Sequence, residues 1–154
     1  MKKVENIREL FQVMTRRFGL LNKNCCSIND VDISLVQSHI LYEINKSEYS
    51  SMQQVAEVLG MDITTFSRQI QNLVKMGLVK KTPLPEDRRV YTLSLTTEGK
   101  FITTTIDQEI NRYFDDVFSH MTEFEKVTVI RSIKLLNECM AKTSLCCNPL
   151  VISR

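Results

Sequence analysis

Apolar residues along this chain form helical stripes toward both ends and a short alternating pattern between them. From residue 51 to residue 77, apolar positions recur at spacings of three and four in two short segments, which predicts two short helices. Between residues 78 and 95, apolar and polar positions alternate, which predicts the two strands of a hairpin. Helical spacing is also present before residue 47 and after residue 97. The pattern therefore predicts a mainly α-helical protein with one small β-hairpin.

The two short helices carry recognisable start and stop signals. Ser51 and Gln54 have the spacing of a capping box, and Gly60 follows the first helix where a residue tolerant of positive φ is favoured. Asp62 is a natural N-cap for the second helix, and Gly77 ends it. The residues that we expect these helices to bury are Val55, Ala56, Leu59, Ile63, Phe66, Ile70, Leu73 and Val74.

The remaining face of the second helix is polar and contains no acidic residue. Two short helices joined by a glycine-containing turn match the helix-turn-helix arrangement, whose second helix reads the major groove. Arginine can bridge the two acceptors of guanine, and glutamine suits the donor and acceptor of adenine. We therefore predict contacts with double-stranded DNA from this face, which consists of Thr64, Thr65, Ser67, Arg68, Gln69, Gln71, Asn72 and Lys75. The residues that we expect to face base edges are Thr64, Thr65, Arg68 and Gln69.

The hairpin adds a basic, exposed tip to this arrangement. Residues 78–82 predict one strand, and Tyr91, Leu93 and Leu95 alternate with polar residues in the other. Prolines exclude the intervening segment from a sheet interior, and an arginine there could enter a narrow minor groove. The residues of this predicted tip are Pro83, Pro85, Glu86, Asp87, Arg88 and Arg89.

Each charged residue of this region receives a predicted role. We expect Arg89, with its neighbour Arg88, to insert into the minor groove, and Asp87 to orient Arg89 through a charge-assisted hydrogen bond. The residues that we expect to lie near phosphates are Lys75, Lys80 and Lys81.

Taken together, these motifs resemble the MarR family of bacterial regulators. The resemblance covers roughly residues 30–140 and includes the runs QSHILYEI and SMQQVAEVLGMDITTFSRQIQNLVKMGLVKKTPLPEDRRVYTLSLTTEG. The family's signature is a helix-turn-helix followed by a wing with an Asp-x-Arg motif and a closing Leu-Thr-x-x-Gly. Those residues are here Asp87, Arg89, Leu95, Thr96 and Gly99. The resemblance implies a winged helix-turn-helix that binds DNA as a homodimer.

One position departs from the family's pattern. The residue after the first wing strand, often arginine in the family, lies here in the pair Lys80-Lys81. Lysine is a point charge without the planar fork of arginine, so the pair favours a phosphate contact over a bidentate contact.

Further helices are predicted on both sides of this region. The apolar stripe of the first consists of Val4, Ile7, Phe11, Met14, Phe18 and Leu21. Residues 22–32 are a polar connection, after which Ser34 and Gln37 form a capping box. The residues that we expect the following helix to bury are Leu35, Ile40, Leu41 and Ile44.

After the wing, the pattern predicts two long helices. Thr96 or Thr97 caps the first, and Thr122 forms a capping box with Glu125 at the start of the second. With the N-terminal helix, they have more apolar surface than one small winged domain can cover. That surface fits packing onto the chain's own domain or a seam with a second subunit, and the resemblance favours the homodimer. The single domain then comprises dimerisation helices in residues 1–24 and 97–143, a DNA-binding region in residues 33–95 and a C-terminal tail in residues 144–154.

Composition narrows the class of protein without identifying it. The formal net charge of +2 is too small to indicate nucleic-acid binding by itself, whereas residues 63–82 contain four basic residues and no acid. No apolar run approaches the roughly 18 residues of a membrane span, and the N-terminus lacks a signal-peptide core. We therefore expect a cytoplasmic protein without a membrane partner.

Catalysis has little support in this sequence. His39 and His120 are far apart and have no neighbouring nucleophile motif, so we expect no enzyme, no catalytic residue and no cofactor. The more individual feature is cysteine, in the adjacent pairs Cys25-Cys26 and Cys146-Cys147. These pairs fit inert thiols, thiol redox sensing, or soft-metal or metalloid binding. Their spacing matches no zinc pattern, so the sequence identifies no metal site.

The function predicted from these features is transcriptional regulation. A homodimer would bind a pseudo-palindromic operator, act as a repressor, and be released by a small ligand or by an oxidant or soft metal acting on the thiols. The alternative is a winged-helix module for protein contacts, or a thiol- or metal-binding protein, without operator binding. The basic wing and the acid-free helix face favour the regulator.

Overall fold

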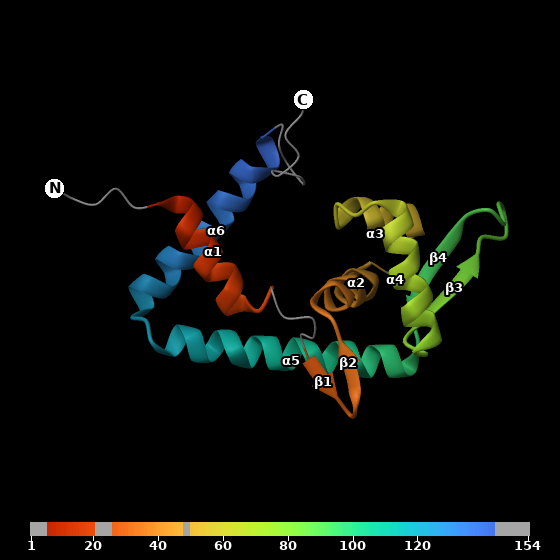
Figure 1. Cartoon of the computed structure of the whole chain (residues 1–154), viewed down its shortest axis with the longest axis horizontal. Helices are drawn as coiled ribbons and strands as arrows, with labels where there is room; N and C mark the ends of the chain where they lie inside the picture. The colour runs from red at the N-terminus through yellow and green to blue at the C-terminus, as the bar shows by residue number, and fades with distance from the viewer. Residues whose placement is uncertain (1–5, 21–25, 48–49, 144–154) are drawn as a thin grey trace. The chain divides into compact units, whose positions relative to one another are not determined.

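The computed structural model describes residues 6–20, 26–47 and 50–143. The chain divides into two compact units, Met1–Ile106 and Asp107–Arg154, and α5 is continuous across the boundary. The elements, labelled in Figure 1, are α1 (Ile7–Phe18), β1 (Cys26–Ile28), β2 (Val31–Ile33), α2 (Leu35–Lys46), α3 (Met52–Val58), α4 (Ile63–Lys75), β3 (Val79–Pro83), β4 (Tyr91–Leu95), α5 (Thr97–Ser119) and α6 (Glu123–Lys142).

Local capping fixes where most of these helices begin. Each predicted capping box has both of its hydrogen bonds, one from backbone to hydroxyl and one from backbone to side-chain carbonyl or carboxylate. These confirmed pairs are Ser34 with Gln37, Ser51 with Gln54, and Thr122 with Glu125. Thr96, rather than Thr97, caps α5, because its Oγ1 accepts a hydrogen bond from the Gly99 N–H at 2.9 Å.

One apolar core holds the first unit together. This core joins α2, α3, α4, both strand pairs and the first turns of α5. The helix-turn-helix and the wing, both predicted from the sequence, therefore pack on the same core. Its fully buried large side chains include Ile33, Ile40, Leu41, Phe66, Ile70, Leu73, Leu78, Leu93 and Ile102.

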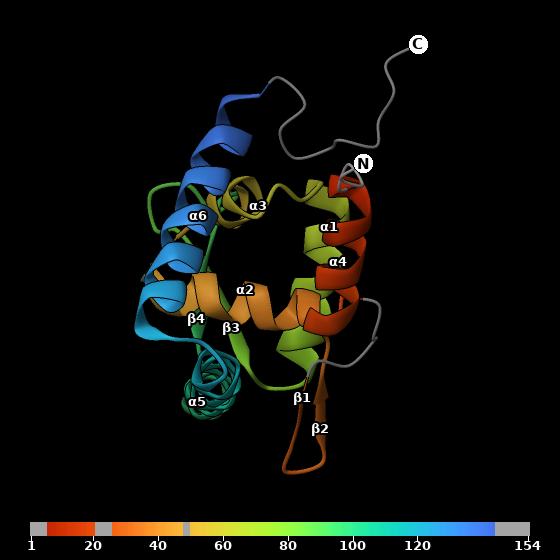
Figure 2. The same cartoon turned by 90° about the vertical axis from the view of Figure 1, so that its left-hand side faces the viewer.

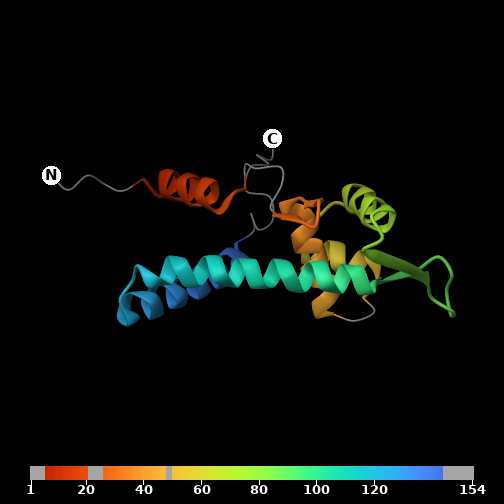
Figure 3. The same ribbon diagram turned by 90° about the horizontal axis from the view of Figure 1, so that it is seen from below.

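The wing is a two-stranded antiparallel hairpin, as predicted. Val79 pairs with Leu95 at its base, and Pro83 pairs with Tyr91 at its far end. Pro83 therefore belongs to β3 rather than to the tip, which corrects the predicted boundary. Figure 3 shows the hairpin extending beyond α4 and the start of α5.

The connection over residues 22–32 was expected to be irregular, and its described part is instead a second hairpin. Ile28 pairs with Val31 across Asn29 and Asp30, both of which have positive φ. A two-residue turn of this kind matches the twist of the strands, and asparagine and aspartate tolerate it better than most residues. Figure 2 shows the β1–β2 hairpin extending away from α2. Strands of three residues are too short to display an alternating pattern, so the sequence did not indicate them.

Burial within the helix-turn-helix also differs from the prediction at several positions. Ile63 and Val74 were expected in the core of α4, but they are 49% and 41% exposed. Both lie at the ends of the helix, where the packed partners of the central stripe no longer cover them. Leu35 and Leu59 are half-buried rather than buried.

The second unit contains the rest of α5 and α6. None of the residues of α6 is buried, although the helix carries an apolar stripe. The same holds for α1 in the first unit, whose exposed residues include Ile7, Leu10 and Met14. Val4 and Leu21, which were predicted to extend this stripe, lie outside the described residues.

Candidate nucleic-acid interface

The N-terminal turn of α4 is held by its cap. Asp62 Oδ2 accepts hydrogen bonds from the Thr65 N–H at 3.1 Å and from the Thr65 hydroxyl at 3.4 Å. Gly60, with φ of 62°, supplies the turn that separates α3 from α4. The first exposed residues of α4 thus have a fixed backbone.

The outward face of α4 is polar, exposed and free of acidic side chains along the helix. Thr64, Thr65 and Arg68 are exposed, and within the described residues Arg68 makes no ion pair. Ser67 and Gln69 were placed on the same face but are half-buried. The exposed residues of this face are Thr64, Thr65, Arg68, Gln71, Asn72 and Lys75. Among the residues expected to face base edges, only Gln69 is half-buried.

At the wing tip, Asp87 holds Arg89 through three contacts. Asp87 Oδ1 accepts hydrogen bonds from the Arg89 N–H and from Nε, both at 3.1 Å, and Oδ2 accepts one from Nη2 at 3.3 Å. These contacts lower the pKa of Asp87 from its ordinary value of 3.8, because the side-chain and backbone hydrogen bonds from Arg89 favour the carboxylate. The predicted contact between the two residues is confirmed.

Arg89 nevertheless remains almost fully accessible. Its side chain is 91% exposed, and the carboxylate engages Nε and Nη2 only. The other guanidinium N–H donors are available to an external acceptor. The tip thus presents an oriented cation beyond the end of the strands.

The two lysines of β3 lie on opposite faces of the wing. Lys80 pairs with Ser94 and Lys81 with Leu93, and successive side chains of a strand point to opposite sides. The Lys81 ammonium lies 4.3 Å from the centroid of the Tyr91 ring. The contact between Lys81 and Tyr91 was not predicted from the sequence, although Tyr91 is two residues from Leu93, the strand partner of Lys81. The pairing register of the two strands is the feature from which this contact could have been predicted.

The base of the wing is joined tightly to α4 and α5. The Thr96 hydroxyl donates to the Gly77 carbonyl at 2.6 Å, and the Thr96 N–H donates to the Leu78 carbonyl at 3.1 Å. A Cβ at Gly99 would lie 2.0 Å from the Leu78 carbonyl oxygen. This close approach explains why a glycine occupies position 99, and it couples the start of α5 to the end of α4.

The N-terminus of α3 is joined to the other edge of the wing. The Leu93 N–H donates to the Ser50 carbonyl at 3.0 Å, and Ser51 forms an isolated bridge with Thr92. Residues that flank both helices of the helix-turn-helix are thus hydrogen-bonded to the wing or to its base.

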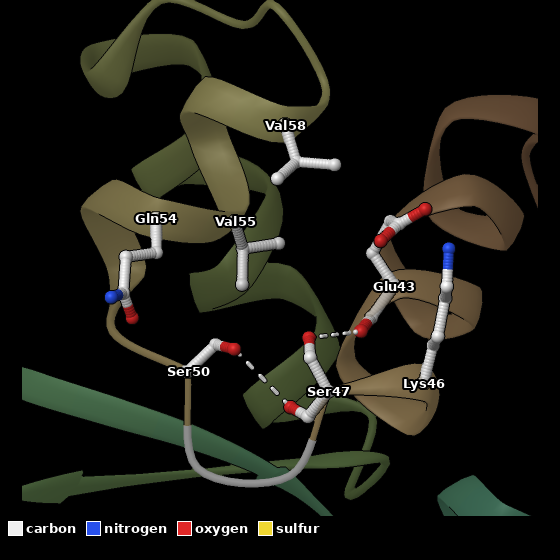
Figure 4. A pocket seen from close by; sticks show the side chains of 7 residues that line it. All are labelled: Glu43, Lys46, Ser47, Ser50, Gln54, Val55 and Val58. Carbon is white, nitrogen blue, oxygen red and sulfur yellow. Dashed lines mark hydrogen bonds between the residues drawn. The ribbon is translucent and has the colours of Figure 1, made fainter.

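A pocket of about 300 Å³ lies between the end of α2 and α3 (Figure 4). Two hydroxyls on its wall already bond to backbone carbonyls: that of Ser47 to Glu43 at 2.8 Å, and that of Ser50 to Ser47 at 3.3 Å. The Gln54 amide oxygen is used in the capping box of α3. The charged groups on its wall are the side chains of Glu43 and Lys46.

Most of the predicted sensing thiols lie outside the described residues, namely Cys25, Cys146 and Cys147. Cys26 is half-buried in β1, and Cys139 is exposed on α6. In the parts of the chain that the structure describes, no group of three or more His, Cys, Asp and Glu side chains could hold a metal ion. No helix among the described residues is long and apolar enough to cross a membrane.

Comparison with known proteins places these features in a wider group. A family model described as "MarR family" matches residues 31–90. The chain is 35% identical over 136 residues to the HTH-type transcriptional regulator PapX of Escherichia coli, covering 78% of this chain and 82% of PapX.

Solved structures show the same fold. The structure of Streptococcus pneumoniae FabT in complex with DNA has a TM-score of 0.78 at 21% identity, covering 88% of this chain and 95% of that chain. A mutant MarR from E. coli complexed with operator DNA has a TM-score of 0.68 at 25% identity, covering 84% of this chain and 91% of that chain. At these levels of sequence identity, the structural similarity is evidence for the fold.

Proposed function

Because the chain belongs to the MarR family of transcriptional regulators, we propose that it binds an operator as a homodimer and represses transcription from it. Members of this family are transcriptional regulators rather than enzymes. The observation that carries the proposal is the acid-free exposed face of α4 in the same compact unit as the wing, whose tip carries the oriented Arg89.

The major groove receives α4. Thr64, Thr65 and Arg68 face base edges, and the half-buried Ser67 and Gln69 support them from the side of the helix. An arginine with no ion pair to break loses little on binding the two acceptors of a guanine.

The flanking contacts come from the lysines and the wing. Lys75, Lys80 and Lys81 lie near phosphates, and Arg89 enters the adjacent minor groove with Arg88 beside it and Asp87 behind it. Since Lys80 and Lys81 occupy opposite faces of the hairpin, they contact phosphates on different sides of the wing.

The homodimer is built from α1, α6 and the second part of α5. These helices expose Ile7, Leu10, Tyr113, Phe124 and Leu135 by 64%, 51%, 44%, 80% and 61% of their surface. Obligate interfaces resemble a domain core cut in half and often exceed about 2,000 Å². A two-fold dimer requires a pseudo-palindromic operator with half-site centres roughly 34–36 Å apart.

Release from DNA follows a chemical signal. Cys26 is the first residue of β1, Cys25 precedes it in sequence, and Cys146 and Cys147 follow α6 in sequence. An oxidant or soft metal acting on these thiols would alter the spacing of the two α4 helices. The other effector class is a small ligand bound between helices.

The thiol signal is tested by titrating reduced protein with peroxide, a quinone, Zn²⁺ or arsenite while following operator binding. We expect the parent to release DNA and the Cys25→Ser/Cys26→Ser and Cys146→Ser/Cys147→Ser variants to hold it. If all three proteins release DNA alike, these cysteines do not sense the signal. The effector is then the small ligand bound between helices.

Operator binding itself is tested by electrophoretic mobility of the fragment upstream of the chain's own gene, against unrelated DNA of equal length and composition. We expect a discrete complex at concentrations at least about tenfold lower for the upstream fragment, at a stated salt concentration. Equal affinity for both fragments at all salt concentrations would favour a module for protein contacts over a regulator that binds an operator.

A further inference from the structure

Ile63 is the one apolar side chain at the exposed start of α4. It is the first residue of the helix and is 49% exposed, whereas Ile70, two turns later on the same stripe, is fully buried. An exposed isoleucine alone has no special meaning, because single apolar residues are common on protein surfaces. Its position gives it meaning: it adjoins Thr64, and Ser67 lies one turn further along the same side of the helix.

The backbone and the side-chain rotamer of Ile63 are both restricted by the local structure. The Asp62 carboxylate fixes the first turn through the Thr65 N–H, so the backbone at Ile63 is ordered before any partner arrives. A β-branched side chain in a helix has essentially one χ1 rotamer. Little conformational entropy is therefore lost when an apolar group packs against it.

The major groove contains one apolar group that fits. The N-terminal residues of a recognition helix approach base edges, and among those edges the C5-methyl group of thymine is the apolar feature. We propose that Ile63 is a specificity-determining residue that contacts the C5-methyl of a thymine in each half-site, at the N-terminal end of α4. This inference rests on the proposed operator binding and adds a residue that the polar pattern did not include.

The test removes the methyl group from DNA and leaves every hydrogen-bonding edge in place. In the operator duplex defined by footprinting, each thymine is replaced singly by deoxyuridine, and dissociation constants are measured by fluorescence anisotropy. We expect the wild type to lose about threefold to tenfold in affinity at one thymine position in each half-site. The Ile63→Ala variant should bind the thymine and uracil duplexes equally.

Two further variants control the result. Val74→Ala shortens another exposed apolar side chain of α4, 41% exposed at the far end of the helix, and should keep the full uracil effect. Ile63→Val retains the β-branched shape and removes one methyl group, so it should fold even if Ile63→Ala does not, and its uracil effect should be smaller than that of the wild type.

The outcomes separate this inference from the proposed function. A wild type that binds its operator specifically but tolerates uracil at every thymine overturns the role of Ile63 alone. A uracil effect that persists unchanged in the Ile63 variants overturns it as well. A wild type that does not discriminate its operator from unrelated DNA overturns both.

Discussion

At the scale of single residues, the proposed interface divides cations into those that read bases and those that bind phosphate. Arg68 is exposed on the acid-free face of α4, and Lys81 is held over the Tyr91 ring on the wing. A guanidinium forms directional pairs with guanine, whereas an ammonium interacts with phosphate as a point charge. The two classes should therefore respond differently to substitution.

Arg68→Ala should reduce operator affinity by about 1–3 kcal/mol and relax specificity at one base position per half-site. Lys81→Ala should instead weaken all sequences alike and reduce the slope of log affinity against log salt by about one. Binding measured over a range of salt concentrations, with operator and unrelated duplexes, distinguishes the two. Unchanged operator affinity in both variants would remove α4 and the wing from the interface.

Arg89 is expected to sense minor-groove width. Asp87 orients it, and because the pKa of Asp87 is lowered, the carboxylate is lost only as pH falls through a value below 3.8, so the contact is intact at neutral pH. A·T-rich flanks, which have a narrow and more negative groove, should bind better. Arg89→Ala should lower affinity and abolish that preference together, as measured on duplexes with A·T-rich and G·C-rich flanks. A preference for A·T-rich flanks that persists in Arg89→Ala would exclude minor-groove readout by Arg89.

At the scale of elements, the junction of α4, the wing and α5 depends on a glycine that lacks room for any side chain. Gly99 lies in α5, and a Cβ there would collide with the Leu78 backbone carbonyl. Thr96 reinforces the junction by bonding to Gly77 on one side and Gly99 on the other. The angle between wing and α4 is therefore set by backbone contacts.

Gly99→Ala should destabilise the protein by about 1–3 kcal/mol, because the overlap outweighs the gain of roughly 1 kcal/mol in helix propensity. Gly77→Asn is the control: position 77 has φ of 74° and open space around it, and asparagine tolerates positive φ. Urea denaturation at one fixed protein concentration measures both. A Gly99→Ala variant as stable as its parent would show that the Leu78 backbone can move to accommodate a Cβ at position 99 at little cost.

At the scale of the whole molecule, we expect a second copy of the chain to cover the apolar faces of α1 and α6. None of the residues of either helix is buried in the single chain. Apolar surface of this extent contributes on the order of 25 cal/mol per Å² when removed from water, so association should be tight.

Sedimentation equilibrium should show a dimer at micromolar concentration. Leu10→Glu, which places a charge on the exposed face of α1, should dissociate it, whereas Val58→Glu on α3, at a site 68% exposed in the chain, should leave it intact. A stable, folded monomer of the parent at the same concentration would contradict the proposed dimer.

The sequence by itself determined what depends on neighbours within about four residues. The three capping boxes, the Asp62 cap, the positive φ of Gly60 and Gly77, and the Asp87–Arg89 contact all join residues close in sequence, so their types and spacing predicted them. The strand alternation likewise predicted the wing.

Tertiary structure decided the features that depend on residues distant in sequence. Exposure of Ile63 and Val74 follows from where the packing partners of α4 end, and the position of Lys81 over Tyr91 follows from the strand register. The approach of Gly99 to Leu78 joins residues 21 positions apart. Helical periodicity specifies which side a residue takes but not whether another element covers it, because burial is set by the elements that fold against that side.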